Sequence, residues 1–364
     1  MAIDLRVNLG PRSYDLVFHH AALDQVGAFA RARSRGTSSL VIADENVKLI
    51  AATVASSLEK EGFRAPLVTR PPGEAQKSLS VAARLYDTLI DLPADRRTLI
   101  VAVGGGVIGD LAGFVAATYA RGLPLLMVPT TLLAMVDSSI GGKVAVNHPR
   151  GKNMIGVFHQ PVGVWIDFAA LDTLPDREFR SGLAEIVKYG VILDPALFAY
   201  LEENAAAILR RDPVAIAHIV TRCCQLKAQV VEQDEREETG VRAILNYGHT
   251  FAHAFETAAS YGAWLHGEAV AAGMVCASRL AERQGLVPSA VTQRQIALLS
   301  AFSLPTGIPA WDAAGLIATM RTDKKSVAGK MRFILPTRIG EVTLVEDIAE
   351  DHVRAVLGES TVPV

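Results

Sequence analysis

The sequence predicts an α/β protein in two parts: an N-terminal domain built on a mainly parallel sheet, then a mainly α-helical domain. Up to about residue 170, short apolar runs alternate with patterns of helical period, as they do in α/β sheets. A glycine-rich turn separates one of these runs from the helix that follows it. After about Pro175 long helical patterns dominate, and 364 residues suffice for two domains.

The N-terminal half is expected to begin with two short strands in residues 3–19, around a turn at Gly10-Pro11. The carboxyl ends of parallel strands meet at one edge of a sheet, where ligands bind. Asp44, Gly104–Gly106 and Thr130-Thr131 fall at such ends. Further strands are expected at residues 39–43, 67–68, 99–103, 125–129 and 162–166, and helices at 21–33, up to about residue 60, at 78–90 and after Gly109.

The C-terminal half is expected to be helical, with one small hairpin at residues 331–345 that turns at Ile339-Gly340. The domain boundary should lie near Asp172 to Asp176, which gives domains of residues 1–174 and 175–364. A cleft between two domains is a common ligand site, and we expect the site there. The helical patterns cover residues 177–190, 195–210, 213–237, 248–260, 267–285 and 288–300.

The composition excludes several classes of protein. A formal net charge of -2 gives no global basic field, so no nucleic acid partner is expected. The cysteines are odd in number and two of them, Cys223 and Cys224, are adjacent, which favours reduced thiols in the cytoplasm over a disulfide framework. The N-terminus is not a signal peptide, and Gly, Pro, Arg or Asp break the apolar stretches, so no membrane span is expected.

The stretch from Leu99 to Lys143 predicts strand, glycine turn, helix and strand, with Gly104, Gly106 and Gly109 in a G-x-G-x-x-G pattern. Without Cβ atoms, such a turn lets a pyrophosphate approach the backbone amides and the positive end of the helix. The alternative is a tight turn with no ligand. No acidic residue follows about 20 positions later, so Asp44 is the better candidate for a ribose contact.

Three histidines and a glutamate in the C-terminal half are candidate metal ligands. His249 and His253 are four residues apart and share a helix face, a spacing that suits one metal ion. His266 follows, and Glu185 lies upstream on an otherwise apolar helix. The alternatives are surface or core histidines, and spacing alone, which nominates His249 and His253, does not separate a ligand from an acid–base catalyst.

Basic and polar residues also collect in unusual places. Each alone is typical of a solvated surface, whereas several that converge would bind the phosphate and carboxylate of one small anionic substrate. Asp137-Ser138-Ser139 either orients a hydroxyl or a nicotinamide, or caps a helix. The other residues concerned are Lys143, Lys152, Asn153, Lys188, Lys227, Arg242, Asn246, Lys324 and Lys325.

Seven blocks of sequence form a combination that is highly specific. They are Pro72-Gly73-Glu74 with Lys77, GGGVIGDLAGFVAATYARG, PTTLLAMVDSSIGGKVAVNHPRGKNMIGVFHQP, SGLAEIVKYG, LNYGHTFAHAFE, HGEAVAAGM, and Asp323-Lys324-Lys325. With them the chain resembles the 3-dehydroquinate synthase family of sugar-phosphate cyclases. The resemblance implies a Rossmann-like, NAD-binding N-terminal domain, a helical, metal-binding C-terminal domain, and a homodimer.

The resemblance also implies roles for individual residues. Glu185, His249 and His266 would hold Zn²⁺ or Co²⁺, with His253 as a second-sphere or proton-relay residue. Arg121 matches a phosphate contact supplied across the dimer. NAD would be held by Asp44, Asn46, Glu74, Lys77, Gly105, Gly106, Val107, Asp110, Thr130, Thr131, Asp137, Ser138, Lys143, Lys152, Thr173 and Leu174. Catalytic or substrate contacts would come from Asp137, Lys143, Asn153, Lys188, Lys227, Arg242, Asn246, His253, Lys324 and Lys325.

The reaction implied by the resemblance converts 3-deoxy-D-arabino-heptulosonate 7-phosphate to 3-dehydroquinate and phosphate, in the shikimate pathway. NAD takes a hydride from carbon 5, which makes the proton on carbon 6 acidic beside a ketone. Phosphate then leaves, the hydride returns, the ring opens and an intramolecular aldol step closes the carbocycle. NAD is therefore used but not consumed.

Three other functions compete with this one. A sugar-phosphate cyclase of the 2-deoxy-scyllo-inosose or valiolone type shares the NAD and metal motifs, but Lys227, Asn246 and His253 match the dehydroquinate type. A metal-dependent dehydrogenase of the glycerol type would not need so many cations for phosphate and carboxylate. A non-catalytic regulator on this fold is disfavoured because Glu185, His249 and His266 are all present.

Overall fold

The computed structural model describes residues 3–259, 263–322 and 331–362. Its contacts divide the chain into two compact units, Met1–Pro175 with Lys227–Arg236, and Asp176–Leu226 with Glu237–Val364. The end of helix α7 (Pro213–Gln233) belongs to the first unit because it is bonded there: Asn8 N donates to Glu232 at 2.6 Å. The division between residues 174 and 175 stays a prediction about folding domains.

The first unit is built on a seven-stranded sheet in the order β1-β2-β9-β6-β5-β3-β4. All neighbours are parallel except β1 and β2. Every residue of β5 and β6 is buried, which explains their unbroken apolar sequences. The strands confirm those expected from the sequence: β1 (Ile3–Val7), β2 (Tyr14–His19), β3 (Ser39–Asp44), β4 (Leu67–Arg70), β5 (Leu99–Gly104), β6 (Leu125–Pro129) and β9 (Gly163–Asp167).

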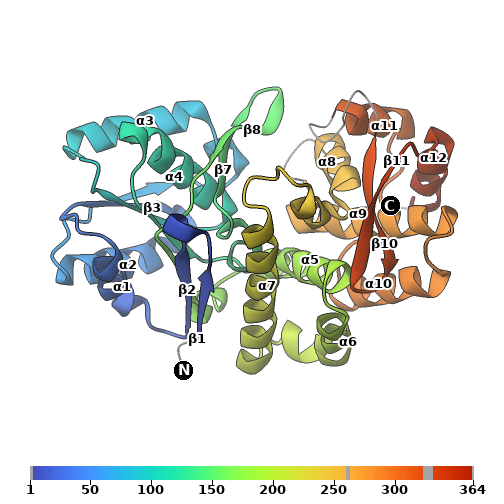
Figure 1. The fold of residues 1–364 in the computed structure, drawn as a ribbon, viewed down its shortest axis with the longest axis horizontal. Coiled ribbons are helices and arrows are strands. Elements are labelled where there is room, and N and C mark those ends of the chain that lie inside the picture. Colours follow the sequence, from blue (N-terminus) through green and yellow to red (C-terminus); the bar gives the residue numbers. More distant parts are fainter. Residues whose placement is uncertain (1–2, 260–262, 323–330, 363–364) are drawn as a thin grey trace. The chain divides into compact units, whose positions relative to one another are not determined.

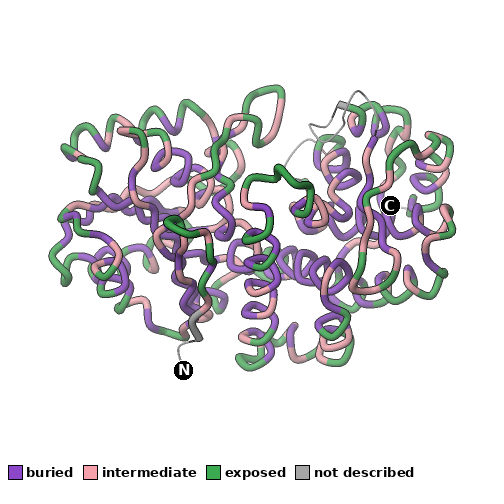
Figure 2. The backbone as a smooth tube through the Cα atoms, in the orientation of Figure 1, coloured by how far each residue is buried: buried purple, intermediate pink, exposed green. Residues whose placement is uncertain are grey.

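Helices cover both faces of this sheet. They are α1 (Val26–Arg33), α2 (Lys48–Lys60), α3 (Leu79–Asp91) and α4 (Gly106–Thr118). Helices α1 and α2 lie on one side of the sheet, and α3 and α4 on the other (Figure 1). The apolar side chains of α1 and α2 form one buried cluster with those of the central strands. These strands are coloured as buried in Figure 2. The Rossmann-like α/β architecture predicted for this half is therefore present.

A second hairpin in this unit was not expected from the sequence. Strands β7 (Lys143–His148) and β8 (Gly151–Phe158) pair antiparallel outside the main sheet. Five of the eight residues of β8 are exposed and none is buried, so no apolar alternation marks it as a strand. A π-helical turn at Ala134–Ser138, also unexpected, precedes the hairpin.

The second unit is mainly helical, as predicted, and α5 lies at its centre. Every residue of α5 from Ser181 to Ile192 is buried. The expected elements are α5 (Asp176–Ile192), α6 (Pro195–Leu209), α7, α8 (His249–Ala258), α9 (His266–Arg283), α10 (Ser289–Ala301) and the hairpin of β10 (Arg332–Arg338) and β11 (Glu341–Glu346). Two further helices, α11 (Ala313–Thr322) and α12 (Glu350–Glu359), were not expected.

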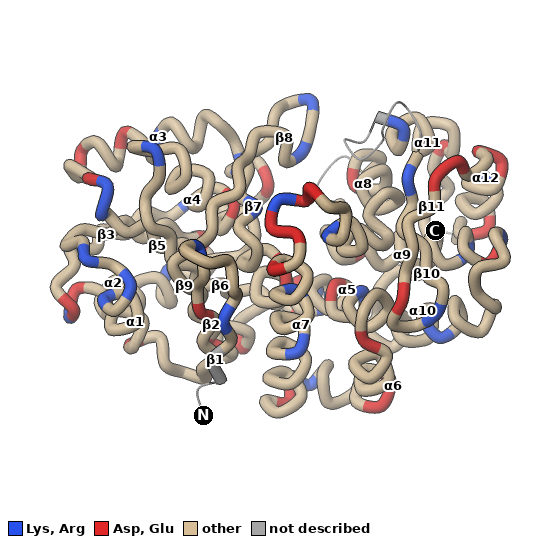
Figure 3. The backbone as a smooth tube through the Cα atoms, viewed as in Figure 1, with Lys and Arg blue, Asp and Glu red and all other residues tan. Residues whose placement is uncertain are grey.

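The end of α7 corrects the sequence prediction, which ran to residue 237. The helix ends at Gln233, where the apolar period stops and charged residues follow. These charges form a dense segment of both signs next to the end of α7 in Figure 3. Among the described residues, no helix combines the length and the apolarity that a membrane crossing requires.

Candidate active site

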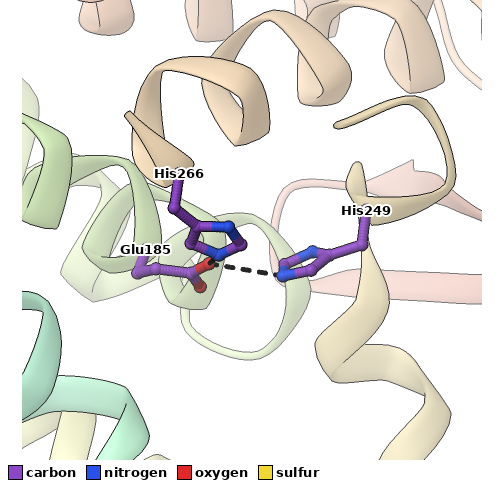
Figure 4. A group of neighbouring side chains, drawn as sticks. All are labelled: Glu185, His249 and His266. Atoms are coloured by element: carbon purple, nitrogen blue, oxygen red, sulfur yellow. Dashed lines mark ion pairs between the residues drawn. The ribbon is translucent and has the colours of Figure 1, made fainter. Parts of the chain in front are cut away.

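Three side chains that could ligate one metal ion meet in the second unit: Glu185 on α5, His249 at the start of α8 and His266 at the start of α9 (Figure 4). We call them the metal-binding triad. Glu185 Oε1 lies 3.4 Å from the Nε2 atom of each histidine. Ligands held at about 2.1 Å in a tetrahedron stand about 3.4 Å apart, so both distances match a shared metal ion. One carboxylate and two imidazoles suit Zn²⁺ and related divalent ions, with a position left open for substrate.

Two close helix approaches bring these ligands together. A Cβ on Gly267 would lie 1.8 Å from the carbonyl oxygen of Ser181, and Gly267 N donates to Ser181 Oγ at 3.0 Å. Ser181 lies one turn before Glu185 on the same face of α5, so this contact sets His266 beside Glu185. A Cβ on Gly273 would lie 2.3 Å from the carbonyl oxygen of Gly248, which holds the start of α8 against α9.

The outer nitrogen of each histidine has its own acceptor. His249 Nδ1 lies 3.0 Å from the carbonyl oxygen of Tyr247, and His266 Nδ1 lies 3.1 Å from Glu256 Oε1. Such bonds fix the tautomer and leave Nε2 as the metal-binding atom. Sequence reasoning missed Glu256, although its position two turns after His249 on one helix was an available signal.

The same contacts change the protonation of His266. Burial by itself lowers its pKa, but the hydrogen bonds to Glu185 and Glu256 outweigh burial and raise the pKa to about 9. A raised pKa favours the protonated imidazole, whereas a metal ligand must be the neutral form. A metal ion must displace that proton, so metal binding is coupled to proton release.

Other predicted residues of this unit surround or precede the triad. Lys188 is buried and forms an ion pair with Glu185 one turn away. The ring of His253 meets that of His249 edge-on, with centroids 5.8 Å apart, and His253 is not part of the metal-binding group. Arg242 is buried on the 3₁₀ segment Val241–Asn246, which ends three residues before His249. Lys324 and Lys325 lie outside the described residues.

The glycine turn in the first unit has the geometry of an anion cradle. Helix α4 begins at Gly106 with no side-chain cap, so the first N–H groups of the helix remain available to a ligand. A Cβ on Gly105 would lie 3.1 Å from Thr131 Cγ2, and a Cβ on Gly106 would lie 3.2 Å from Ser138 Oγ. A side chain at either position would fill the space in front of the first N–H groups of α4. Because both residues are glycines, that space fits the pyrophosphate of NAD.

The residues expected to bind NAD gather at one edge of this sheet. Asp44 ends β3 and accepts a hydrogen bond from Asn46 N at 2.8 Å. Strand β5, which ends at Gly104, has β3 and β6 as its two parallel neighbours, and Thr130 and Thr131 follow β6. The other predicted residues of this unit are Val107 on α4, Lys143 and Lys152 on the separate hairpin, and Thr173 and Leu174 just before residue 175, where the first part of the unit ends.

Lys77 joins several of the predicted residues. It is buried, forms an ion pair with Asp110 on α4 and donates to Asn153 Oδ1 on β8. Burial raises the pKa of Asp110, and Lys77 acts against that rise. Asn147, which sequence reasoning missed with its hairpin, donates to Glu74 Oε1 at 2.8 Å and accepts from Asn153 N at 2.8 Å.

The π-helical turn displays Asp137 toward Lys227. Lys227 Nζ lies 2.5 Å from Asp137 Oδ1 and 2.6 Å from the Asp137 carbonyl oxygen. Lys227 is 90 residues away in sequence and stands in the part of α7 that belongs to the first unit. A π-helical turn is rare and often marks a functional site, which agrees with the predicted role of Asp137 in the site.

Arg121 is held on a strained turn after α4. Ala120 and Arg121 have φ values of 48° and 69°, which side chains with a Cβ rarely adopt. Such strain costs about 1–3 kcal/mol and tends to occur at functional sites. The exposed Arg121 side chain makes no ion pair with the described residues.

Known proteins are similar in sequence to nearly the whole chain. Residues 67–181 match the model of the 3-dehydroquinate synthase N-terminal domain, and residues 182–326 match that of the C-terminal domain. The 3-dehydroquinate synthase of Desulforamulus reducens is 49% identical over 357 residues, which cover 98% of this chain and 99% of that protein. The chain belongs to the 3-dehydroquinate synthase family. Another member, from Pelobacter propionicus, is 49% identical over 95% of this chain and 96% of its own.

Solved structures related to this 3-dehydroquinate synthase family share the fold. A 2-deoxy-scyllo-inosose synthase in complex with carbaglucose-6-phosphate, NAD⁺ and Co²⁺ superposes with a TM-score of 0.89 at 29% identity, covering 98% of this chain and all of the other. A 2-epi-5-epi-valiolone synthase from Streptomyces hygroscopicus with NAD⁺ and Zn²⁺ bound gives 0.87 at 29% identity, over 95% and 96% of the chains. A probable glycerol dehydrogenase from Sinorhizobium meliloti, at 16% identity and a TM-score of 0.64, shares the fold alone.

Proposed function

We propose that the chain converts 3-deoxy-D-arabino-heptulosonate 7-phosphate to 3-dehydroquinate and phosphate. The observation that carries this proposal is the 49% identity to curated 3-dehydroquinate synthases over 98% of the chain. The intact glycine turn and the intact metal-binding triad support it, because the reaction needs both a hydride acceptor and a Lewis acid. The cyclases with other products are more distant, at 29% identity.

Two cofactors fit the described residues. Glu185, His249 and His266 would hold Zn²⁺ or Co²⁺, and the turn at Gly104–Gly106 with Asp44 would hold NAD. When bound, NAD supplies a temporary hydride acceptor and the metal polarises the substrate hydroxyls.

The side chains of the protein bind and orient the substrate. Buried Lys188 and Arg242 and the predicted contacts Lys143, Asn153 and Lys227 supply donors for the phosphate and carboxylate groups. His253, beside His249, moves the hydroxyl proton. Fixing one conformer of the ring-opened intermediate favours correct closure, an orientation effect worth up to ~7–11 kcal/mol.

The active form is a homodimer in which Arg121 reaches the substrate phosphate of the partner subunit. Three observations support this assignment. The strained turn presents Arg121 to the outside of the unit, and His159 Nε2, just after β8, is bonded at 2.8 Å to the carbonyl oxygen of Leu123. Strand β8 exposes Met154, Val157 and Phe158, apolar side chains typical of an interface core.

The three free, buried cysteines are consistent with an enzyme of the cytoplasm. Cys223, Cys224 and Cys276 are all buried, and none forms a disulfide. Buried, reduced thiols are typical of proteins in reducing compartments, and we place this enzyme in the cytoplasm on that basis.

A phosphate-release assay tests the activity. The purified chain with NAD, Zn²⁺ or Co²⁺ and the heptulosonate phosphate should release inorganic phosphate and form 3-dehydroquinate, with no net NADH. Glucose 6-phosphate and glycerol serve as alternative substrates, and the His266→Ala variant as the negative control. Steady NADH accumulation with glycerol, or turnover of glucose 6-phosphate alone, would contradict the proposal.

A further inference from the structure

A chain of buried polar side chains runs through the second unit behind the metal-binding triad. The Tyr247 hydroxyl lies 2.7 Å from Gln295 Oε1 and 3.0 Å from the Met274 carbonyl oxygen, and it donates to these acceptors. Gln295 Nε2 donates to Ser278 Oγ at 3.0 Å, and Ser278 Oγ lies 2.7 Å from Thr292 Oγ1. Tyr247 lies in the segment just before α8, Ser278 on α9, and Thr292 and Gln295 on α10.

These four side chains are shielded from water. Tyr247, Gln295 and Ser278 are 0% exposed and Thr292 is 1% exposed. A buried polar group without a partner costs about 1–3 kcal/mol, so each member constrains the geometry of the next. Apolar side chains of similar size would fill the same space, so packing alone does not explain this network.

At one end of this network is Tyr247, whose carbonyl oxygen is hydrogen-bonded to the proposed metal ligand His249. The carbonyl oxygen of Tyr247 can only accept, so His249 Nδ1 carries the proton in the 3.0 Å bond between them. Gly248, between the two residues, has a φ of 77°, and a Cβ there would lie 2.9 Å from Met274 N. The peptide after Tyr247 is thus held on one side by α9 and on the other by the buried phenol.

We propose that Tyr247 and Gln295 are positioning residues for the metal site, which keep the Tyr247 carbonyl oxygen aimed at His249 Nδ1. The inference rests on the metal site of the proposed function and extends it to a residue on α10, which supplies none of the three ligands. Gln295 accepts from the phenol and is itself fixed by Ser278, so it sets the direction of the Tyr247 ring. With the phenol fixed, His249 keeps the tautomer that offers Nε2 to the metal.

The test compares metal binding with stability in three variants of the full chain. Tyr247→Phe removes one hydroxyl, and Gln295→Met replaces the amide by an apolar side chain of similar length. Leu298→Ala is the matched control, because it truncates a buried apolar residue of the same helix. Affinity for Zn²⁺ and Co²⁺ is measured by chelator competition, the visible spectrum of the Co²⁺ form reports coordination, and thermal unfolding is followed without metal.

We expect Tyr247→Phe and Gln295→Met to weaken metal binding about 10-fold, the low end of the cost of losing a direct outer partner, and to alter the Co²⁺ spectrum. Leu298→Ala should lower the unfolding temperature and leave metal affinity unchanged. Unaltered affinity and spectrum in Tyr247→Phe would overturn the inference, and so would an equal loss of affinity in Leu298→Ala. If the unmodified chain binds neither ion, the proposed metal site fails first, which is a distinguishable result.

Discussion

At the residue scale, the glycines of this chain are required for two different reasons. Gly105 and Gly106 leave space beside Thr131 and Ser138 at the start of α4, where a ligand can approach the backbone. Gly267 and Gly273 allow helices to touch through their backbones. Gly109 differs from all four, because a Cβ there would meet only Met127 at 3.8 Å, an ordinary contact. The third glycine of the G-x-G-x-x-G pattern is therefore not sterically required.

This difference predicts opposite effects for two substitutions on α4. Gly106→Ala places a methyl group 3.2 Å from Ser138 Oγ and should weaken NAD binding about 10-fold. Gly109→Ala should leave NAD affinity within about twofold and stabilise the helix by about 0.5–1 kcal/mol. Calorimetric titration with NAD and urea unfolding measure the two effects. Equal NAD affinity in both variants would mean that the turn does not bind the cofactor.

At the element scale, the start of α6 depends on one carboxylate. Asp194 accepts hydrogen bonds from Ala196 N at 3.0 Å and Leu197 N at 3.1 Å, and Arg222 Nε donates to it at 2.5 Å. Burial favours the neutral acid, but these donors outweigh burial and lower the pKa of Asp194. The bonds from Ala196 and Leu197 cap the start of α6, and the bond from Arg222 ties this cap to α7.

Asp194→Ala should therefore destabilise the chain by about 1–3 kcal/mol at pH 7. A lowered carboxyl pKa contributes stability above the unfolded value of about 3.9, and that contribution is lost as the pH falls through the folded pKa. The difference between variant and unmodified chain should shrink below about pH 4, as measured by urea unfolding at several pH values. Asp212→Ala is the control for the loss of a helix cap: Asp212 accepts hydrogen bonds from Val214 N and Ala215 N at the start of α7. A loss independent of pH would contradict the ionic role of Asp194.

At the scale of the whole molecule, the site residues divide between the two units. The residues proposed for NAD belong to the first unit, and the metal-binding triad belongs to the second. Helix α7 contributes to both, since its final turns carry Lys227, the partner of Asp137. The proposed dimer adds Arg121 from a second copy. The proposed function therefore predicts that both units are needed for activity, and the proposed dimer predicts sites shared between subunits.

Mixed dimers test that assignment. An Arg121→Ala subunit lacks the donated arginine, and a Glu185→Gln subunit lacks a metal ligand, so each alone should be nearly inactive. Random mixing of subunits should restore about a quarter of the unmodified activity, because half of the dimers then contain one complete site. Phosphate release is measured after the subunits exchange, with mixed dimers verified by differently tagged chains. No recovery in verified mixed dimers would rule out the shared site.

The sequence by itself determined the order of the strands along the chain, the glycine turn and the helical character of the second half. These follow from local patterns, because buried strands such as β5 and β6 are apolar throughout and a turn such as Gly104–Gly106 needs a particular backbone. The hairpin of β7 and β8 was missed for the same reason: an exposed strand carries no apolar pattern.

Only the tertiary structure decided which groups meet. Local spacing predicted His249 and His253 as metal ligands, because residues four apart share a helix face. The family resemblance replaced His253 in that prediction by Glu185 and His266. The structure shows the physical cause of that set. The backbone contact of Gly267 with Ser181 sets His266 beside Glu185, and the close approach of Gly273 to the Gly248 carbonyl oxygen holds the start of α8, with His249, against α9. Such contacts join residues far apart in sequence, and no local periodicity records them.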